Sequence, residues 1–362
     1  MTVESNESLA RKYQEELNSA IKRYSKALGY VDSPPDVPVA QTPKEVIWTR
    51  NKAKLYHYLP IGPRRYREPL LFIYSLMNKA FILDIRPGSS MIEFLVRQGY
   101  DVYLLDWGIP GPEDAHTSIE DYVFDYMPRA IKHTLRQADT DQLSLIGYCL
   151  GGVLSFCYTA THPITPVKNL TTFAIPLDFS QQQLFNEWLN PKNINLNLLL
   201  NAYGNIPGQF LDFSMRLQDP VAGFVSSYLG ILDKVLDDRA VESWMSMQKW
   251  MRETIPFAGT AFKQCAEEMW FKNKLVRNQF MLRGQPVDFS NIKMSYLNVL
   301  ADRDQIVLMS QSDMALGLVS SQDKEQIVVP GGHIGLAVGR TAVKGLWPAL
   351  DKWLSARSES YP

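Results

Sequence analysis

The stretch LSLIGYCLGG at residues 143–152 decides the fold of this 362-residue chain. Its apolar first half predicts a buried strand, and the glycines around Cys149 predict a sharp turn into a helix. In the pattern Gly-x-Ser-x-Gly, such a turn presents its central residue as a nucleophile. Here cysteine takes the central position, between Gly147 and Gly151. The alternative interpretation is a structural cysteine buried in a glycine-containing turn.

Short apolar runs alternate with helical patterns on both sides of this stretch. Continuous apolarity in short strands is typical of a parallel sheet that helices cover on both faces. Together with the nucleophile turn, the alternation predicts an α/β-hydrolase fold with a mostly parallel sheet. We expect strands at residues 69–74, 102–105, 142–146, 170–175, 295–300 and 326–329.

The alternation stops at residues 178–284, where the pattern is mainly helical, with helical runs at 193–200, 225–236 and 241–251. We interpret this segment as a cap inserted over the carboxyl ends of the strands, where open α/β sheets bind ligands. The catalytic core is then expected at residues 61–177 and 285–362. Residues 1–60 are expected to hold an amphipathic helix from about Ser8 to Leu28 and then a proline-rich linker.

Composition excludes several classes of protein. Lys and Arg number 37 against 38 Asp and Glu, so the composition lacks the basic excess that is typical of nucleic-acid-binding proteins. Three cysteines without a Cys-x-x-Cys pair argue against a disulfide framework or a thiolate zinc site, and they fit a reducing cytoplasm. Cys157 is expected in the core, and Cys265 has no supporting context. We see no signal peptide, no run near the roughly 20 apolar residues of a membrane span, and no metal or nucleotide motif. A soluble protein without a cofactor is expected.

A nucleophile of this kind needs a general base. Only one histidine occupies a glycine loop, PGGHIG at residues 330–335, directly after a predicted strand near the C-terminus. The α/β-hydrolase fold places its histidine there, because its chain order is nucleophile, acid, base. We therefore predict that His333 is the base. The other histidines lack this context: His57, His116, His133 and His162.

The acid should follow the preceding strand, where Asp302 and Asp304 compete. The spacing from the end of the strand favours Asp304, with Asp302 as a turn residue. Positions 304 and 333 also leave room for one helix and one strand between them. The backbone N–H groups of Leu150 and Met77 are the expected oxyanion donors, because one follows the nucleophile and the other follows an early strand.

Five motifs support a resemblance to a known family. They are TPKEVIWT at 42–49, VYLLDWG at 102–108, GYCLGG at 147–152, GNIP at 204–207 and PGGHIG at 330–335. With these motifs, the chain resembles the catalytic subunit of polyhydroxyalkanoate synthases, the cysteine-dependent polyester polymerases. Its length and opening segments are most similar to the short two-component enzymes of Bacillus type.

The resemblance implies a catalytic triad of Cys149, Asp304 and His333, which favours Asp304 over Asp302. One departure is Gln305, because the family commonly has histidine after this aspartate. The resemblance further implies transfer of acyl groups from (R)-3-hydroxyacyl-CoA to a growing polyester, with CoA as part of a substrate rather than a cofactor. It also implies a small partner subunit, a homodimer and a place at the surface of cytoplasmic polyester granules.

Two other functions remain open from the residues. A cysteine-dependent hydrolase, such as a thioesterase or polyester depolymerase, would use the same three residues on the same fold. A granule-surface scaffold with a vestigial site is the second alternative, although three residues in the right order speak against it. The N-terminal helix likewise has two interpretations, since it could dock a partner or pack on its own domain.

Overall fold

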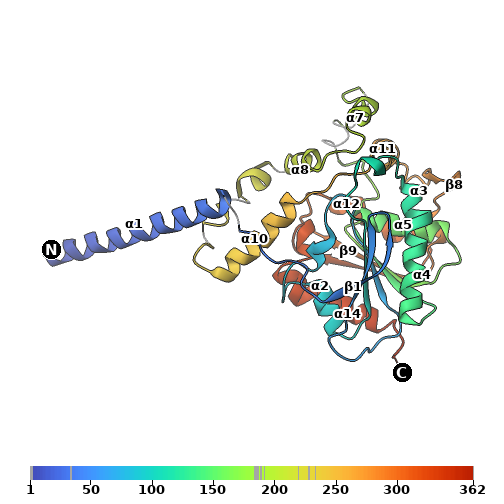
Figure 1. Ribbon diagram of the computed structural model, residues 1–362, viewed down its shortest axis with the longest axis horizontal. Coiled ribbons are helices and arrows are strands. Elements are labelled where there is room, and N and C mark those ends of the chain that lie inside the picture. Colours follow the sequence, from blue (N-terminus) through green and yellow to red (C-terminus); the bar gives the residue numbers. More distant parts are fainter. Residues whose placement is uncertain are drawn as a thin grey trace.

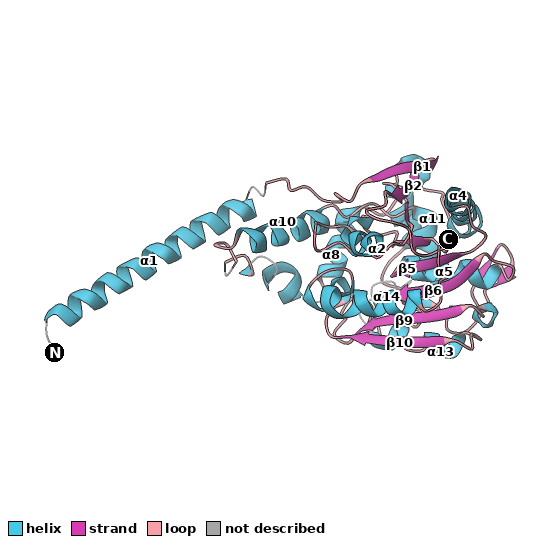
Figure 2. Ribbon diagram, turned by 90° about the horizontal axis from the view of Figure 1, so that it is seen from below, coloured by secondary structure: helices cyan, strands magenta, loops and turns pink. Residues whose placement is uncertain are grey.

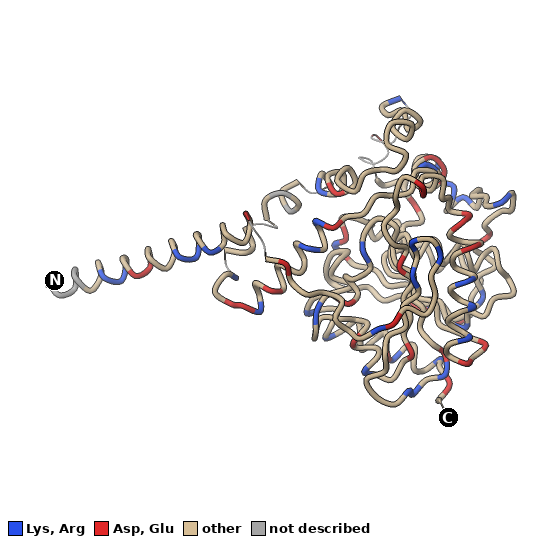
Figure 3. Tube along the Cα trace, viewed as in Figure 1, with Lys and Arg blue, Asp and Glu red and all other residues tan. Residues whose placement is uncertain are grey.

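The computed structural model describes residues 3–32, 35–182, 187, 190, 192–218, 220–226, 229–232 and 234–361. Its centre is a twisted sheet with helices on both faces, a group of helices lies over one edge, and one long helix projects away (Figure 1). The expected α/β-hydrolase fold is confirmed. Charges of both signs are scattered over the body in the view of Figure 3, as a net charge of −1 predicts.

The eight-stranded sheet has the order β1-β2-β4-β3-β5-β6-β9-β10. All neighbours from β4 to β10 pair in parallel, whereas β2 pairs antiparallel with β1 and with β4. The six predicted strands are all present. The strands are β1 Lys44–Arg50, β2 Ala53–Tyr58, β3 Leu70–Ile73, β4 Val102–Asp106, β5 Leu143–Tyr148, β6 Val167–Phe173, β9 Ser295–Ala301 and β10 Lys324–Val329.

Strands β1 and β2 lie inside the segment that we assigned to the N-terminal helix and linker, so the sheet begins well before residue 61. The two strands form an antiparallel hairpin around Asn51, whose φ is 49°. Residues of β1 are exposed or half-buried. An edge hairpin of this kind lacks the continuous apolar run that identifies a central strand, which is why the sequence did not reveal it.

Helices cover both faces of the sheet. Side chains of α4 and α5 enter one buried cluster, and side chains of α2 and α14 enter the other. The core α-helices are α2 Met91–Arg97, α3 Ile119–Asp121, α4 Met127–Ala138, α5 Leu150–Thr161, α12 Met309–Ser312, α13 Ala315–Leu318 and α14 Trp347–Ser355. Short 3-10 or π segments are Ala80–Leu83, Pro112–Asp114, Tyr122–Tyr126, Ala222–Ser226, Cys265–Phe271, Phe289–Asn291, His333–Leu336 and Ala342–Leu346.

The described residues between β6 and β9 are mainly helical, with α7 Leu196–Tyr203, α8 Gly208–Arg216, α10 Asp238–Arg252 and α11 Gly259–Gln264. The predicted run 225–236 lies partly outside the described residues, and its described part consists mostly of turns. A small hairpin of β7 Met281–Leu282 and β8 Gln285–Pro286 spans the expected cap boundary at 284. The exact limits of the cap stay a prediction.

Helix α1 extends over Val3–Asp32, longer than the sequence pattern suggested, and it projects from the body (Figures 1 and 2). Near its C-terminal end, Ala27 packs with Val235 and Trp244 of the cap. No helix among the described residues is long and apolar enough to cross a membrane. Along most of α1, a row of apolar side chains, each 49–63% exposed, forms what we call the α1 stripe: Leu9, Tyr13, Leu17, Ile21, Tyr24 and Leu28.

Candidate active site

Cys149 occupies a sharp turn between β5 and α5, at the carboxyl end of the central strands. Its backbone has φ 55° and ψ −123°, a conformation that non-glycine residues adopt rarely and mostly where function requires it. The Cys149 N–H donates to the Phe173 carbonyl at 2.8 Å, and the Cys149 carbonyl accepts from the Gly152 N–H at 2.9 Å. These two bonds fix the turn between β6 and the first turn of α5, so the thiol position is set by the sheet.

The glycines of the motif are required by close packing. A Cβ on Gly151 would lie 2.2 Å from the carbonyl oxygen of Ile73, at the end of β3. A Cβ on Gly147 would lie 2.5 Å from Cα of Gly152. Only glycine at these positions lets α5 start directly against the sheet, which is the physical reason for the Gly-x-Cys-x-Gly spacing.

Asp304 and His333 meet beside this turn. The Nδ1 atom of His333 lies 2.7 Å from Oδ2 of Asp304, and both side chains are buried. A carboxylate at Nδ1 holds the proton on that nitrogen and leaves Nε2 free to accept one. The side chain of Cys149 lies close enough to His333 to raise the pKa of its imidazole. The structure therefore brings all three predicted residues together, while their catalytic roles stay a prediction.

Further hydrogen bonds orient the acid and the base. The second oxygen of Asp304, Oδ1, accepts from the N–H groups of Ile306 and Val307, each at 2.9 Å. The Tyr148 hydroxyl donates to the backbone carbonyl of His333 at 2.6 Å. Asp302 has a different part, because it is exposed and accepts from the Gly331 N–H at 2.8 Å, in the loop that carries the histidine.

The surroundings of His333 favour its charged form. Burial lowers the pKa of its imidazole, but the charge of Asp304, the charge of Cys149 and hydrogen bonds to both side chains raise it to about 10. The arrangement therefore places a group that can carry a proton beside a sulfur nucleophile suited to attack a carbonyl carbon.

The two expected oxyanion donors lie at the site. Leu150 and Met77 both line a cavity of about 60 Å³ that contains Cys149. The Met77 N–H has a long 3.4 Å contact with the Ser75 hydroxyl. Their positions suit a role in binding a developing negative charge, and that role stays a prediction.

The cavity at Cys149 adjoins two larger ones. A cavity of about 500 Å³ shares Met77, Met215 and Trp270 with it, and its other lining residues come from the cap. A cavity of about 260 Å³ shares Met215, Gln218 and Ile306 with it and also contains Gln305. Sequence patterns missed these cap residues, because no motif marks them. Apolar side chains dominate the lining of the 500 Å³ cavity, including Ile194, Leu199, Phe210, Leu217 and Phe262.

The remaining cysteines lie in the core. Cys157 on α5 and Cys265 are fully buried, and burial raises the pKa of each thiol. Asp106, at the end of β4, accepts from the Gly108 N–H at 2.8 Å in a turn. Cys157, Cys265 and Asp106 therefore have structural roles. None of the three forms a hydrogen bond with His333 or Asp304 among the described residues.

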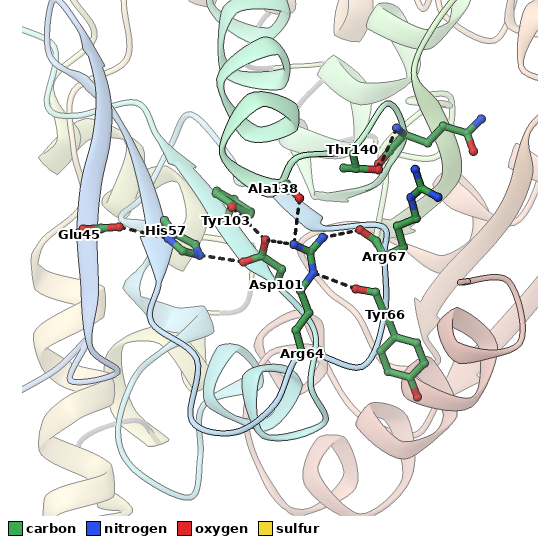
Figure 4. Close-up of polar contacts among 10 residues, drawn as sticks. Glu45, His57, Arg64, Tyr66, Arg67, Asp101, Tyr103, Ala138 and Thr140 are labelled. Carbon is green, nitrogen blue, oxygen red and sulfur yellow. Dashed lines mark hydrogen bonds and ion pairs between the residues drawn. The ribbon is translucent and has the colours of Figure 1, made fainter. Parts of the chain in front are cut away.

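His57 belongs to a polar network away from Cys149, shown in Figure 4. Its Nε2 lies 2.8 Å from Oδ1 of Asp101, and its Nδ1 lies 3.3 Å from Glu45. The other oxygen of Asp101 accepts from the Tyr103 hydroxyl at 3.0 Å and pairs with Arg64 at 3.3 Å. The network joins the β1–β2 hairpin to β4. His116 is exposed, His133 stacks on Trp48, and His162 ends α5.

Sequence comparisons point to one family. A family model described as alpha/beta hydrolase fold matches residues 68–339, and one described as the N-terminus of poly-beta-hydroxybutyrate polymerase matches residues 36–95. The chain is 34% identical to the poly(3-hydroxyalkanoate) polymerase subunit PhaC of Haloferax mediterranei, over 97% of this chain and 72% of that protein. It is also 34% identical to the subunit of the same name from Allochromatium vinosum, over 87% of this chain and 89% of that protein.

Solved structures support the fold alone. A putative lipase from Sulfolobus solfataricus superposes with a TM-score of 0.58 at 15% identity, covering 87% of this chain and 93% of the lipase. Epoxide hydrolase A from Mycobacterium thermoresistibile superposes with a TM-score of 0.53 at 13% identity, covering 88% of this chain and 99% of the hydrolase.

Proposed function

The chain belongs to the poly(3-hydroxyalkanoate) polymerase family, and we propose that Cys149, His333 and Asp304 carry out its acyl transfer. It is accordingly an enzyme, an acyl-transferring polymerase. The observation that supports the proposed roles is the contact of 2.7 Å between His333 and Asp304 beside Cys149 on its strained turn. The substrate is an acyl-CoA, proposed to be a (R)-3-hydroxyacyl-CoA, and no cofactor takes part.

In the first half-reaction, His333 holds the proton of Cys149 and the thiolate attacks the thioester carbonyl. The N–H groups of Leu150 and Met77 bind the oxyanion of the tetrahedral intermediate. The bond to the CoA sulfur then breaks, His333 returns the proton to CoA, and an acyl group remains on Cys149 as a thioester. One thioester replaces another in this step, so the acyl group stays activated.

In the second half-reaction, the hydroxyl of another unit gives its proton to His333 and attacks the acyl carbonyl. The bond to the Cys149 sulfur breaks, an ester bond forms, and the sulfur regains a proton from His333. Asp304 keeps the imidazole oriented and stabilises its cationic form in both steps. Each cycle lengthens the polyester by one unit.

The cavities under the cap support synthesis over hydrolysis. The cavity at Cys149 is small and lined largely by apolar side chains, and the 500 Å³ cavity next to it is also predominantly apolar. An apolar lining disfavours water, which would otherwise cleave the acyl-enzyme. We assign the growing polyester to the larger cavity, because an aliphatic ester chain buries apolar surface there.

A cysteine-dependent hydrolase is the competing function, and the acyl acceptor distinguishes the two. The experiment supplies 3-hydroxybutyryl-CoA and measures both CoA release and insoluble polymer, with and without a candidate partner subunit. Polymer with CoA release is expected. Free hydroxy acid without polymer would instead indicate a hydrolase, and no CoA release under either condition would indicate a non-catalytic scaffold.

The nucleophile is tested in the same assay. Cys149→Ala should abolish CoA release and polymer formation, because it removes the sulfur that is proposed to carry the acyl chain. Cys157→Ala is the matched control, since it removes a buried thiol from the same helix and should leave both products. Polymer formation by Cys149→Ala at the wild-type rate would refute the assignment.

We propose that a small partner subunit binds the α1 stripe. Several relatives are named as polymerase subunits, and α1 exposes an apolar face along most of its 30 residues. An amphipathic helix with an unpaired apolar face is suited to pack against another helix. The homodimer implied by the resemblance remains a second proposal.

We further propose that the enzyme works at the surface of polyester granules, which its cap contacts. Leu198 and Tyr203 on α7 and Phe213 on α8 are each more than half exposed. Exposed apolar side chains gathered on one group of helices are suited to contact an apolar surface. Loss of granule binding on replacing Leu198 and Tyr203 with Ser, with CoA release retained, would support this placement, and unchanged binding would contradict it.

A further inference from the structure

Three glutamines lie in the otherwise apolar lining of the cavity that contains Cys149. Gln311 comes from α12, Gln182 from the segment after β6, and Gln218 from the cap after α8. Primary amides in a small apolar cavity need hydrogen-bond partners, because a buried amide without one loses its bonds to water. The partners of each amide therefore show which atoms remain available to a ligand.

The orientation of the Gln311 amide is fixed by its neighbours. Its Oε1 accepts from the Leu308 N–H at 2.8 Å and from Nε2 of Gln182 at 2.8 Å. A backbone N–H can only donate, so the atom facing Leu308 must be the oxygen. Nε2 of Gln182 is fixed in turn by the Ile306 carbonyl at 3.0 Å. The nitrogen of Gln311 is consequently the end of the amide that remains for another partner.

That nitrogen is a buried donor without a hydrogen-bond partner among the residues that the structure describes. Gln311 is 1% exposed, so bulk water does not replace the partner. Capping of α12 explains the bond to Leu308 and accounts for the oxygen only. Nε2 of Gln218 is likewise buried and unpaired within the described part of the chain. Two amide donors thus line the same cavity as the nucleophile.

The position of Gln311 is held from the backbone. Its carbonyl accepts from the N–H groups of Leu177 and Asp178, at 2.9 and 3.2 Å, and the next residue, Ser312, donates its hydroxyl to the Ile175 carbonyl. These bonds tie α12 to the segment that leaves β6. A donor held this firmly loses little freedom when it binds an oxygen, which is the condition for specific recognition.

We propose that Gln311 recognises the oxygen on C3 of the acyl unit carried by Cys149, and that Gln218 supplies a second donor from the cap. The inference rests on the proposed function, because it assumes an acyl group on that sulfur. Backbone donors take the thioester carbonyl oxygen, so the next oxygen along a 3-hydroxyacyl chain is the one on C3. A hydroxyl or ester oxygen there can accept both amide hydrogens.

This recognition makes Gln311 a specificity-determining residue. An acyl group without the C3 oxygen would leave both amide donors buried and unpaired, which penalises it. Sites that hydrogen-bond a substrate hydroxyl reject the analogue lacking it by factors that can reach about 10⁴. An acyl-CoA that cannot continue the chain would therefore acylate Cys149 more slowly.

The test compares 3-hydroxybutyryl-CoA with butyryl-CoA in single-turnover CoA release, which needs no acceptor hydroxyl. The wild type should react faster with the hydroxyacyl substrate. Gln311→Met and Gln218→Met should each lower this preference at least about tenfold, mainly by slowing the hydroxyacyl reaction. The control is Gln322→Met, at an exposed glutamine, which should leave the preference unchanged.

The ratio of the two rates distinguishes a loss of substrate recognition from a general loss of activity. A misfolded or displaced site slows both substrates alike, so an unchanged ratio in both variants would overturn the inference. Gln218→Met keeps the test decisive if Gln311→Met does not fold, because Gln218 makes no bond to the loop of Asp304 among the described residues. If wild-type enzyme released no CoA from either substrate, the proposed function itself would be contradicted instead.

Discussion

Nδ1 of His333 lies 2.7 Å from Oδ2 of Asp304, and the other oxygen of that carboxylate is held by two backbone N–H groups. The carboxylate therefore cannot rotate without losing three bonds. Because it fixes the tautomer of the imidazole, the nitrogen that faces Cys149 is the one able to accept a proton. Replacing Asp304 therefore measures how much a correctly oriented His333 contributes to the reaction rate.

Asp304→Asn should lower the rate of CoA release by a factor of about 10³ to 10⁴, because the amide favours the wrong tautomer of His333. Asp302→Asn is the matched control, since Asp302 is exposed and its neutral amide oxygen can still accept from Gly331. We expect less than about a tenfold loss there. Steady-state rates with circular dichroism of both variants measure the effect, and equal losses would argue against Asp304 as the acid.

Gly151→Ala should destabilise the protein by about 1–3 kcal/mol or more, because its Cβ would collide with the Ile73 carbonyl at the end of β3. The displacement of α5 should also lower the rate of CoA release. Gly345→Ala provides the comparison, since a Cβ there meets no atom within 4 Å. Thermal unfolding of the two variants measures the difference, and similar melting temperatures would show that the turn can relax.

Much of the fold follows from local sequence. The four-residue strand β3 and the strand β5 are buried along their whole length, so their continuous apolar runs predict them directly. Cys149, Asp304 and His333 could then be predicted as a triad, because each of them lies in the loop after a predicted strand. The edge hairpin did not follow, because the pattern of β1 is half polar.

The roles of the glutamine amides at the candidate site could not be predicted from the sequence either. Gln311 lies in a four-residue helix, and its role depends on contacts with Leu308 and with Gln182, which is 129 positions away. Gln218 lines the same cavity as Cys149 only because the cap folds over the sheet edge. No spacing rule connects such positions, since the contacts form only when separate elements pack together.

His57 should make stability depend on pH. Burial alone would lower the pKa of its imidazole, but hydrogen bonds and charges of Asp101 and Glu45 raise it above 6.5. A group whose pKa is raised on folding contributes stability that is complete below its unfolded value, near 6.5, and that is lost as pH rises through the folded value.

His57→Gln should therefore lower the free energy of unfolding by about 1–3 kcal/mol at pH 6, and by less at pH 9. Urea unfolding at the two pH values measures the change. His162→Gln is a suitable control, because burial lowers the pKa of His162 and its loss should not give this pH dependence. An equal effect of His57→Gln at both pH values would show that His57 is not charged in the folded protein.

The α1 stripe yields a prediction about the partner subunit. Leu17→Glu combined with Ile21→Glu places two charges at the centre of the apolar face, where a packed helix would have to bury them. We expect at least about a hundredfold weaker binding of the partner, since burying unpaired charges costs several kcal/mol. Folding should be unaffected, because both side chains are more than half exposed.

A second variant tests whether the change in charge alone weakens binding of the partner. Lys12→Ala with Lys22→Ala makes the same change in net charge on the opposite face of α1, and it should retain the partner. Co-purification and the stimulation of CoA release both report binding. If the two double variants bound the partner equally well, the stripe would not be the docking surface. If both lost it, charge rather than apolar contact would govern the interaction, because only the first pair interrupts the apolar row.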